Sequence, residues 1–387
     1  MPERAPRKTK RPAKRAPAGT DSQSRLGSGL VSVPASRKET MTPRERWLAV
    51  LRRQKPDRVP MDYWATGEAT AKLKAYLGCA GDAEIFERLH IDKVVSVGPK
   101  YIGPKPPEGY DIWGCRHKTV DYGTGTYSEC VLHPLARYTS VEEIEQEYRW
   151  PSPDWWDYSE IAKQLEGKEQ YPIRGGGSEP FLQYDALRGQ EQAMMDLLLN
   201  PEIVHFCLDK LFELAYQGTL RTYEKIPGKV QISYVAEDMG SQEGLMFSPA
   251  QIREFLIPRM KRMIDLAHSA GAYVFHHNDG ACRAIIPDMI AAGIDVLNPV
   301  QWRCKGMDRE GLKRDFGDKL VFHGGVDNQQ TLPFGSVADV RQEVADNLRI
   351  LGRGGGYILA PCHNLQAVSP PENIVALYET GYELGWT

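Results

Sequence analysis

The sequence predicts an α/β fold: a (β/α)8 (TIM) barrel with a β-hairpin insertion and a disordered N-terminal tail. Short apolar runs alternate with segments of helical periodicity through the second half of the chain, which indicates βαβ units and a parallel sheet. About eight strands, each followed by helical material over roughly 345 residues, favour a closed barrel over an open doubly wound sheet. Polar side chains also gather after the apolar runs, where barrel enzymes carry their sites.

Charge divides the chain into two parts. Residues 1–40 carry ten Lys and Arg against three Asp and Glu and few large apolar side chains, so we expect a disordered basic tail. Either a solvated extension or an arm that touches a polyanion explains this composition. Residues 41–387 carry 38 Lys and Arg against 48 Asp and Glu and are expected to form one barrel domain. This acidic balance argues against nucleic-acid binding.

Hydropathy and cysteine usage predict a cytoplasmic protein without a membrane span. No stretch approaches the roughly 18 consecutive apolar residues of a transmembrane helix, and the N-terminus lacks the apolar segment of a secretory signal. The seven cysteines are scattered without a Cys-x-x-Cys pair, which is typical of reduced thiols and argues against a disulfide framework.

The first half of the chain predicts fewer regular elements. Residues 42–53 begin with Thr42, Pro43 and Glu45, a capping box that predicts a helix. Alternation over residues 119–138 predicts the inserted hairpin. The remaining expected elements are strands at 58–64, 93–97 and 171–178 and helical structure over 191–226. The glycine runs at 175–177 and 352–356 are interpreted as tight turns, because neither opens a helix directly after a strand.

The second half alternates strictly. Strands are expected at 230–242, 272–277, 295–300, 319–329 and 356–364. Helices are expected at 248–271, 282–293, 308–317, 337–352 and 370–385. Ser248 and Gly271 mark the start and the end of the first of these helices.

The carboxyl ends of the expected strands carry side chains capable of chemistry. They are Asp62, Tyr63, Glu237, Asp238, His276, His277, Asp279, Asn298, Gln301, His323, Asp327, His363 and Asn364. In a parallel barrel these ends meet on one face, so together they predict an active site.

Within this group, His277, Asp279 and His363 have the chemistry of a divalent metal site that suits Zn²⁺. Without a metal, the same groups could act as general acid and base. His276 is expected to face the barrel wall. Cys282 and Cys362 allow a nucleophilic Cys/His pair as an alternative to small buried thiols.

Several segments resemble the uroporphyrinogen decarboxylase superfamily, and its branch of decarboxylase-like proteins and cobalamin-dependent methyltransferases in particular. They are TPRERWLAVLRRQKPDRVP, AEDMGSQEGLMFSP, DVLNPVQ, GMDREGLKRDFGDKLVFHGGVDNQQTLPFG and GGYILAPCHNLQAVSPPENI. The resemblance runs from about Thr42 to the C-terminus and implies a (β/α)8 barrel. True uroporphyrinogen decarboxylases carry an arginine-rich segment after the first strand that binds the tetrapyrrole carboxylates. Here that place reads MDYWATGEAT, which argues against that activity.

The methyltransferase branch holds zinc with His-x-Cys and a distant Cys. The resemblance places His277 on the family histidine, Asp279 on its first cysteine and His363 on the second. Harder ligands suit an oxygen-bearing substrate better than a thiol. Asp238, His323 and Asp62 are the expected catalytic residues, and Tyr63, Glu237, Asn298, Gln301 and Asp327 the expected substrate-binding residues.

Three functions follow from these observations. The first is a metal-dependent methyltransferase or demethylase that acts on a small oxygenated substrate, with a corrinoid protein docked over the mouth. The second is a metal-independent decarboxylase in which Asp62, Asp238 and His363 steer protons. The third is a barrel that has lost its chemistry. A homodimer is compatible with each.

Overall fold

A curled parallel sheet of seven strands lies at the centre of the part of the chain that the structure describes. The computed structural model describes residues 38–121, 123 and 125–387, so the predicted basic tail lies outside the described residues except for its last three positions. The strand order is β1-β6-β7-β8-β9-β10-β11, with every neighbouring pair parallel. The sheet strands are β1 (Val95–Ser96), β6 (Ile173–Ser178), β7 (Ile232–Ala236), β8 (Tyr273–His277), β9 (Val296–Val300), β10 (Val321–Val326) and β11 (Tyr357–Pro361).

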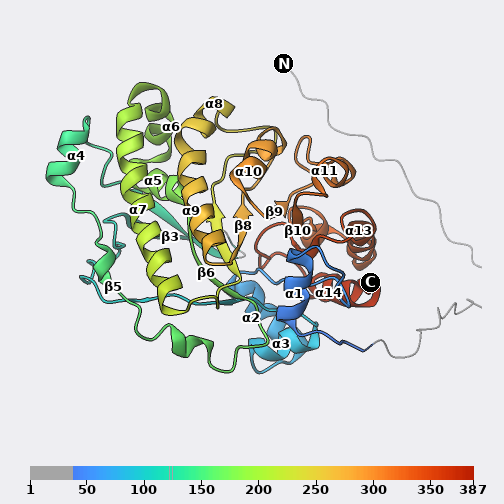
Figure 1. Cartoon of the computed structure of the whole chain (residues 1–387). Helices are drawn as coiled ribbons and strands as arrows, with labels where there is room; N and C mark the ends of the chain where they lie inside the picture. Colours follow the sequence, from blue (N-terminus) through green and yellow to red (C-terminus); the bar gives the residue numbers. More distant parts are fainter. Residues whose placement is uncertain (1–37, 122, 124) are drawn as a thin grey trace, which may run out of the picture. The chain divides into compact units, whose positions relative to one another are not determined.

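Helices surround this sheet (Figure 1), as the alternation of the sequence predicts. They are α1 (Pro43–Leu51), α2 (Gly67–Leu77), α3 (Asp82–Arg88), α4 (Val141–Glu147), α5 (Pro180–Arg188), α6 (Gln190–Leu199), α7 (Pro201–Lys225), α8 (Pro249–Gln251), α9 (Ile257–Ser269), α10 (Ile286–Ala292), α11 (Arg309–Phe316), α12 (Thr331–Phe334), α13 (Val337–Ile350) and α14 (Pro371–Leu384). The architecture confirms the α/β fold of the TIM-barrel kind. No helix among the described residues combines the length and apolar character needed to cross a membrane.

The segment from Val59 to Asp62 lies beside β11, the last strand in the order of the sheet, and pairs with it through a single bridge. Met61 forms a parallel bridge with Leu359 of β11, and the amide of Asp62 donates to the Leu359 carbonyl at 2.9 Å. On its other side, the amide of Asp92 donates to the Met61 carbonyl at 2.8 Å. The preceding Pro60 has no N–H, which limits ladder pairing here to a bridge.

Helix α1 closes the amino-terminal end of the barrel. Trp47, Val50 and Leu51 pack into an inner apolar cluster with residues from the starts of the strands, including Ile232 and Val321. The predicted capping box is present, with the Thr42 side chain accepting from the Glu45 amide. Because this end is filled, the opposite end is where a ligand has access to the barrel.

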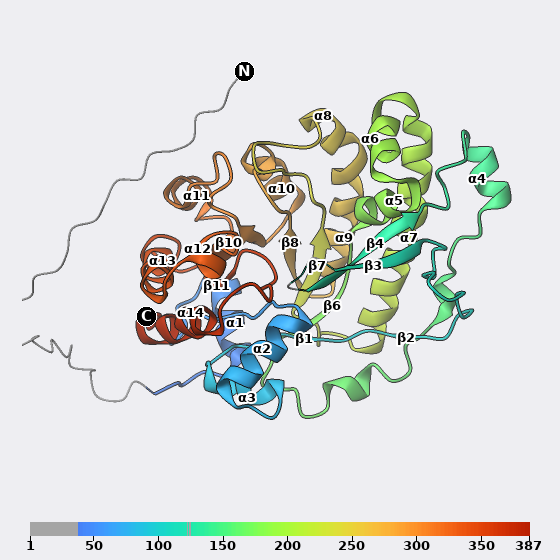
Figure 2. The ribbon, with the colours of Figure 1, turned by 180° about the vertical axis from the view of Figure 1, so that it is seen from behind.

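The predicted hairpin is confirmed as β3 (Arg116–Asp121) and β4 (Thr126–Leu132), which pair antiparallel. Figure 2 shows it outside the sheet, starting beside α5 and α7. The thiols of Cys115 and Cys130 both donate to the Ala186 carbonyl of α5, which anchors the base of the hairpin.

Two expectations need correction. The helix expected over residues 248–271 divides into α8, a π-helical turn (Ile252–Leu256) and α9. Pro258 lacks the N–H for an α-helical bond at the second position of α9, and the wider turn accommodates that loss. The glycine run 175–177 is no turn, since it lies within β6.

Candidate metal centre

Three side chains that could bind a metal ion lie at the carboxyl ends of strands β7 and β8. Tyr234 and Phe275 line that cavity, and side chains two residues apart along a strand point to the same side. His277 ends β8 in phase with Phe275, while Asp238 and Asp279 follow the two strands in the same phase. The regular alternation therefore brings all three side chains to one place.

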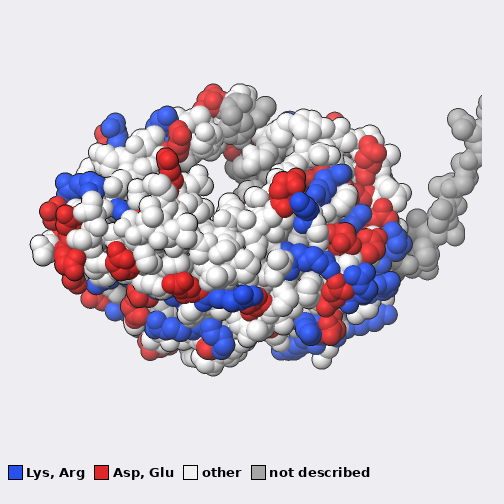
Figure 3. Space-filling view, turned by 90° about the horizontal axis from the view of Figure 1, so that it is seen from above, with Lys and Arg blue, Asp and Glu red and all other residues white. Residues whose placement is uncertain are grey.

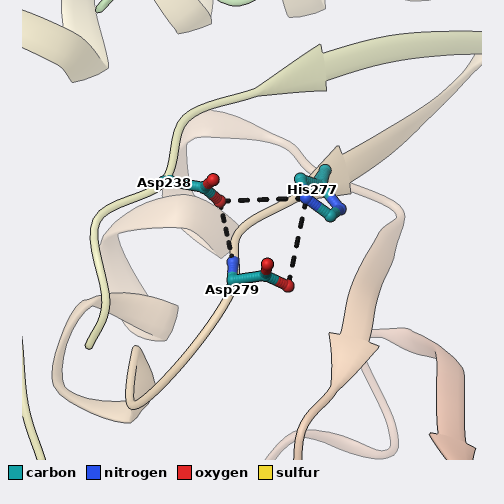
Figure 4. A group of neighbouring side chains, drawn as sticks. All are labelled: Asp238, His277 and Asp279. Carbon is teal, nitrogen blue, oxygen red and sulfur yellow. Dashed lines mark hydrogen bonds and ion pairs between the residues drawn. The ribbon is translucent and has the colours of Figure 1, made fainter. Parts of the chain in front are cut away.

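The side chains of Asp238, His277 and Asp279 face one another (Figure 4). One nitrogen or oxygen from each of the three lies within 4.8 Å of the others. Nε2 of His277 is 3.8 Å from Oδ1 of Asp238 and 3.9 Å from Oδ1 of Asp279. The Asp279 amide also donates to Oδ1 of Asp238 at 3.0 Å, which fixes the two loops together.

A chain of hydrogen bonds sets the tautomer of His277. Its Nδ1 lies 2.6 Å from Oδ1 of Asn298, and an amide oxygen only accepts, so Nδ1 carries the proton. The Asn298 amide in turn donates to Nδ1 of His323 at 2.7 Å, and Nε2 of His323 donates to Oδ2 of Asp62 at 3.0 Å. With Nδ1 bonded to Asn298, Nε2 is the nitrogen of His277 that faces the two carboxylates, as the ligating nitrogen of a metal-bound histidine does.

The donor set fits a divalent ion. Oδ1 of Asp279 is buried without a hydrogen-bond partner, which leaves an oxygen free to ligate. Burial raises the pKa of Asp279, with Asp238 adding to the rise and His277 and His363 opposing it. Two carboxylate oxygens and one imidazole nitrogen suit Zn²⁺ and related ions. Nε2 of His363 lies 3.6 Å from Oδ2 of Asp279, at the edge of the group.

Glu179, which directly follows β6, is a further candidate that was not predicted from the sequence. Burial raises the pKa of Glu179 to about 7, with the carboxylates of Asp238 and Asp279 adding to the rise and His277 opposing it. A protonated carboxyl near neutrality, electrostatically coupled to the other three side chains, has the properties of a general acid. Its position directly after the strand predicted over residues 171–178 was the available signal, but residues 175–177 were interpreted as a tight turn.

A cavity of about 610 Å³ lies inside the barrel. Its lining is mainly aromatic, apolar and glycine residues: Trp47, Asp62, Tyr63, Trp64, Ala65, Val94, Ser96, Val97, Arg174, Gly175, Gly176, Ile232, Tyr234, Phe275 and Asn364. The ring of His277 lies 5.8 Å from the rings of both Trp64 and Tyr234, centre to centre, so the candidate metal centre borders this cavity.

Of the residues expected to bind substrate, Tyr63 lines the cavity and bonds to Thr70, while Asn298 orients His277. The structure gives the other three different contacts. Gln301 accepts from the Gly280 amide at 2.8 Å and so fixes the loop after Asp279.

Asp327 and Glu237 are buried away from the cavity. Asp327 accepts from Arg303 and from the amides that begin α12. Glu237 is one residue out of phase with Tyr234 and accepts from the Phe181 amide in α5. Burial raises its pKa well above the ordinary value. The contacts that the structure shows for both acids are structural, and their expected contact with substrate stays a prediction.

The surroundings of Cys282 and Cys362 favour a role as small buried thiols over a role as nucleophile. Cys282 and Cys362 are buried, and burial raises the pKa of both, for Cys282 to about 12. The Cys362 thiol donates to the Val300 carbonyl at 3.1 Å. Neither is a thiolate at neutral pH, which argues against a cysteine nucleophile. His276 faces the wall as expected, with Nδ1 donating to the Val235 carbonyl at 2.8 Å.

The surface gives no sign of a polyanion partner on the face seen in Figure 3. Basic and acidic side chains are interspersed over the outer parts of this face, and mostly uncharged residues border a hollow near its centre. A binding surface for nucleic acid would require a continuous basic patch.

Comparison with solved structures supports the fold. A methyltransferase from Methanosarcina mazei superimposes with a TM-score of 0.64 at 20% sequence identity, covering 89% of this chain and 99% of that chain.

Comparison of sequences gives the family. Uroporphyrinogen decarboxylases from Pseudomonas fluorescens and Pseudomonas putida are each 26% identical over 220 residues, and that from Aeromonas salmonicida is 25% identical. The chain spans 55% of the length of these relatives. The family model for uroporphyrinogen decarboxylase matches residues 120–384. The chain therefore belongs to the uroporphyrinogen decarboxylase family.

Proposed function

We propose that this protein is a metal-dependent methyltransferase that removes a methyl group from a small oxygenated substrate and passes it to a corrinoid held by a partner protein. The observation that carries the proposal is the position of Nε2 of His277, which the bond from Nδ1 to Asn298 holds toward the carboxylates of Asp238 and Asp279. A decarboxylase that only moves protons has no need of this arrangement.

Each residue of the candidate metal centre has a defined task. Asp238, His277 and Asp279 hold the ion, and His363 adjoins them through Asp279. Asn298, His323 and Asp62 keep His277 in its ligating tautomer. When bound by these residues, a divalent ion would supply Lewis-acid chemistry toward an oxygen of the substrate.

Glu179 completes the reaction. When the carbon–oxygen bond of the methyl donor breaks, the methyl group leaves to the acceptor and the electron pair stays on the oxygen. A carboxyl group that is partly protonated near pH 7 can donate a proton to that oxygen. Glu179 then returns to the acid form by taking a proton from water.

Two further observations support methyl transfer over tetrapyrrole decarboxylation. Among the described residues that line the cavity, only Arg174 is a cation, whereas a tetrapyrrole carries several carboxylates that require cations. The structural neighbour from Methanosarcina mazei is itself named a methyltransferase.

Decarboxylation remains the second candidate, because the matched sequence relatives are named uroporphyrinogen decarboxylases. The buried pair of His323 and Asp62 is the feature of this cavity that suits proton delivery without a metal.

Product analysis distinguishes the two functions. The purified protein is incubated with reduced cobalamin and a panel of ¹³C-methyl alcohols and ethers, and methylcobalamin is followed by its absorbance and by NMR. We expect methylcobalamin from at least one donor, and a loss of about 100-fold or more in Asp279→Asn, because the polarising ion contributes several kcal/mol. Release of CO₂ from uroporphyrinogen, without methylcobalamin from any donor, would overturn the proposal in favour of the second candidate.

A further inference from the structure

Arg174 of β6 presents an unpaired cation to the barrel cavity. Its Nε donates to Oγ of Ser96 at 3.1 Å, and its guanidinium carbon lies 5.7 Å from the centre of the Tyr234 ring. Its two Nη groups have no hydrogen-bond or ion-pair partner among the described residues. Four N–H donors are therefore available to an anion in the cavity.

The buried arginines of the described chain, Arg46, Arg58, Arg188 and Arg259, are each paired with a carboxylate, unlike the partly buried Arg174. Arg188 is paired with Asp196 at 2.6 Å, and Arg58 is paired with Asp92 at 2.8 Å. Asp62, the acidic residue in the cavity lining, accepts from Trp64 and His323 instead of Arg174. A cation kept without its own carboxylate in a cavity is typical of a site that receives an anionic ligand.

The walls between Arg174 and the candidate metal centre are flat and aromatic. The Tyr234 ring is stacked with the Phe275 ring at 6.3 Å and with the His277 ring at 5.8 Å, centre to centre. Trp64 lies 5.8 Å from both Phe275 and His277. Because the Tyr234 ring lies within 5.7 Å of the Arg174 guanidinium carbon and 5.8 Å of the His277 ring, one small molecule that packs against it can reach both.

We propose that the substrate is a small monoanion with a flat apolar body. Its anionic group binds Arg174, its body packs along Tyr234, Phe275 and Trp64, and its oxygen substituent lies at Asp238, His277 and Asp279. The position of the oxygen rests on the proposed function, whereas the anion subsite at Arg174 does not. A single cation among the described residues of the lining selects one negative charge, so polycarboxylates are poor ligands.

Ligand binding to the metal-free protein tests the subsite separately from the reaction. Benzoate is titrated into wild type, Arg174→Gln and Arg174→Lys in EDTA, and binding is followed by calorimetry and by quenching of tryptophan fluorescence. Benzenesulfonate distinguishes a general anion site from a carboxylate site, and benzyl alcohol is the neutral analogue. We expect benzoate to bind wild type about 10- to 100-fold more tightly than Arg174→Gln, the range for a charge-assisted hydrogen-bond pair.

Benzyl alcohol is expected to bind both proteins equally, and Arg174→Lys is expected to fall between them. Arg137→Gln, which removes an exposed arginine of the same chain, is the matched control and should leave benzoate affinity unchanged. Circular dichroism and the melting temperature establish that each variant is folded. Equal benzoate affinity in wild type and a folded Arg174→Gln, or stronger binding of benzyl alcohol than of benzoate to wild type, overturns the proposal.

Asp279→Asn separates this inference from the proposed function. If that variant binds benzoate as wild type does but transfers no methyl group, the anion subsite and the metal-dependent reaction both stand. If wild type binds benzoate through Arg174 but transfers no methyl group to cobalamin, the subsite stands and the proposed function fails.

Discussion

The two halves of the barrel differ in regularity and in what they contribute to the site. From β7 to β11 each strand has five or six residues and is followed by helical structure, and this half carries Asp238, His277 and Asp279. In the other half, β1 has two residues, the segment from Val59 to Asp62 forms a single bridge, and β6 contains three glycines. The irregular half supplies Arg174 and Glu179. The regular half thus fixes the candidate metal ligands, while the irregular half contributes Arg174 to the lining of the cavity.

Replacing a glycine of β6 is the most severe test of this difference between the two halves. In Gly177→Ala the new Cβ would lie 1.7 Å from the Tyr234 carbonyl oxygen, at a φ of +124°. We expect a loss of more than about 3 kcal/mol in the free energy of unfolding, or failure to fold, because backbone must move. Urea denaturation measures the change.

Gly228→Ala is the matched control, since its φ of +67° is also left-handed but nothing lies within 4 Å of the added Cβ. It should cost about 1 kcal/mol. If Gly177→Ala were no worse than this control, the glycine strand would not be a packing requirement and the irregular half would be free to vary.

Acid should destabilise the regular half through His276. Burial lowers the pKa of this histidine to about 4, because its Nε2 has no partner and a proton there would be an unsatisfied buried donor. The neutral ring therefore contributes stability that is complete above about pH 6.5 and is lost as pH falls toward 4, in total about 3 kcal/mol. Urea denaturation of the metal-free protein across this range measures the loss.

His276→Asn retains a donor near the Val235 carbonyl but cannot titrate, so its stability should fall less steeply between pH 6.5 and 4. His205→Gln, which removes a partly exposed histidine of α7, should behave as wild type does. Identical slopes for His276→Asn and wild type would show that His276 does not govern acid stability.

Prediction from sequence worked best where local signals and tertiary structure agree. The alternation of apolar runs with capped helices is sufficient to identify β7 to β11, and His277 and Asp279 were found because the carboxyl ends of parallel strands meet. Arg174 and Glu179 flank the glycine run of the strand predicted over residues 171–178, and neither was assigned to the site because that run was also interpreted as a tight turn. Those glycines form a strand for a tertiary reason, the close approach of Tyr234 to Gly177 and of Thr219 to Gly176.

Tertiary structure also decides which residues form the candidate metal group. Spacing along the chain selected His363, whereas the structure brings Asp238 of the neighbouring strand into the group and leaves His363 beside Asp279. Whether Asp238 or His363 joins the group depends on the path of the loop that follows each strand. The spacing of residues along the sequence does not specify that path. Glu237 was assigned to the substrate because alternation beyond the end of a strand is uncertain from sequence; in the structure it is out of phase with the cavity.

Metal binding tests the central claim most directly. Wild type, Asp238→Asn, His277→Ala and His363→Gln are stripped with chelator, titrated with Zn²⁺ by competition against a chromophoric chelator, and analysed for bound metal. The account predicts one tightly held ion per wild-type chain, none in His277→Ala, and a greater loss of affinity in Asp238→Asn than in His363→Gln. A wild-type chain that holds no stoichiometric ion, or a His277→Ala variant with unchanged occupancy, would contradict it.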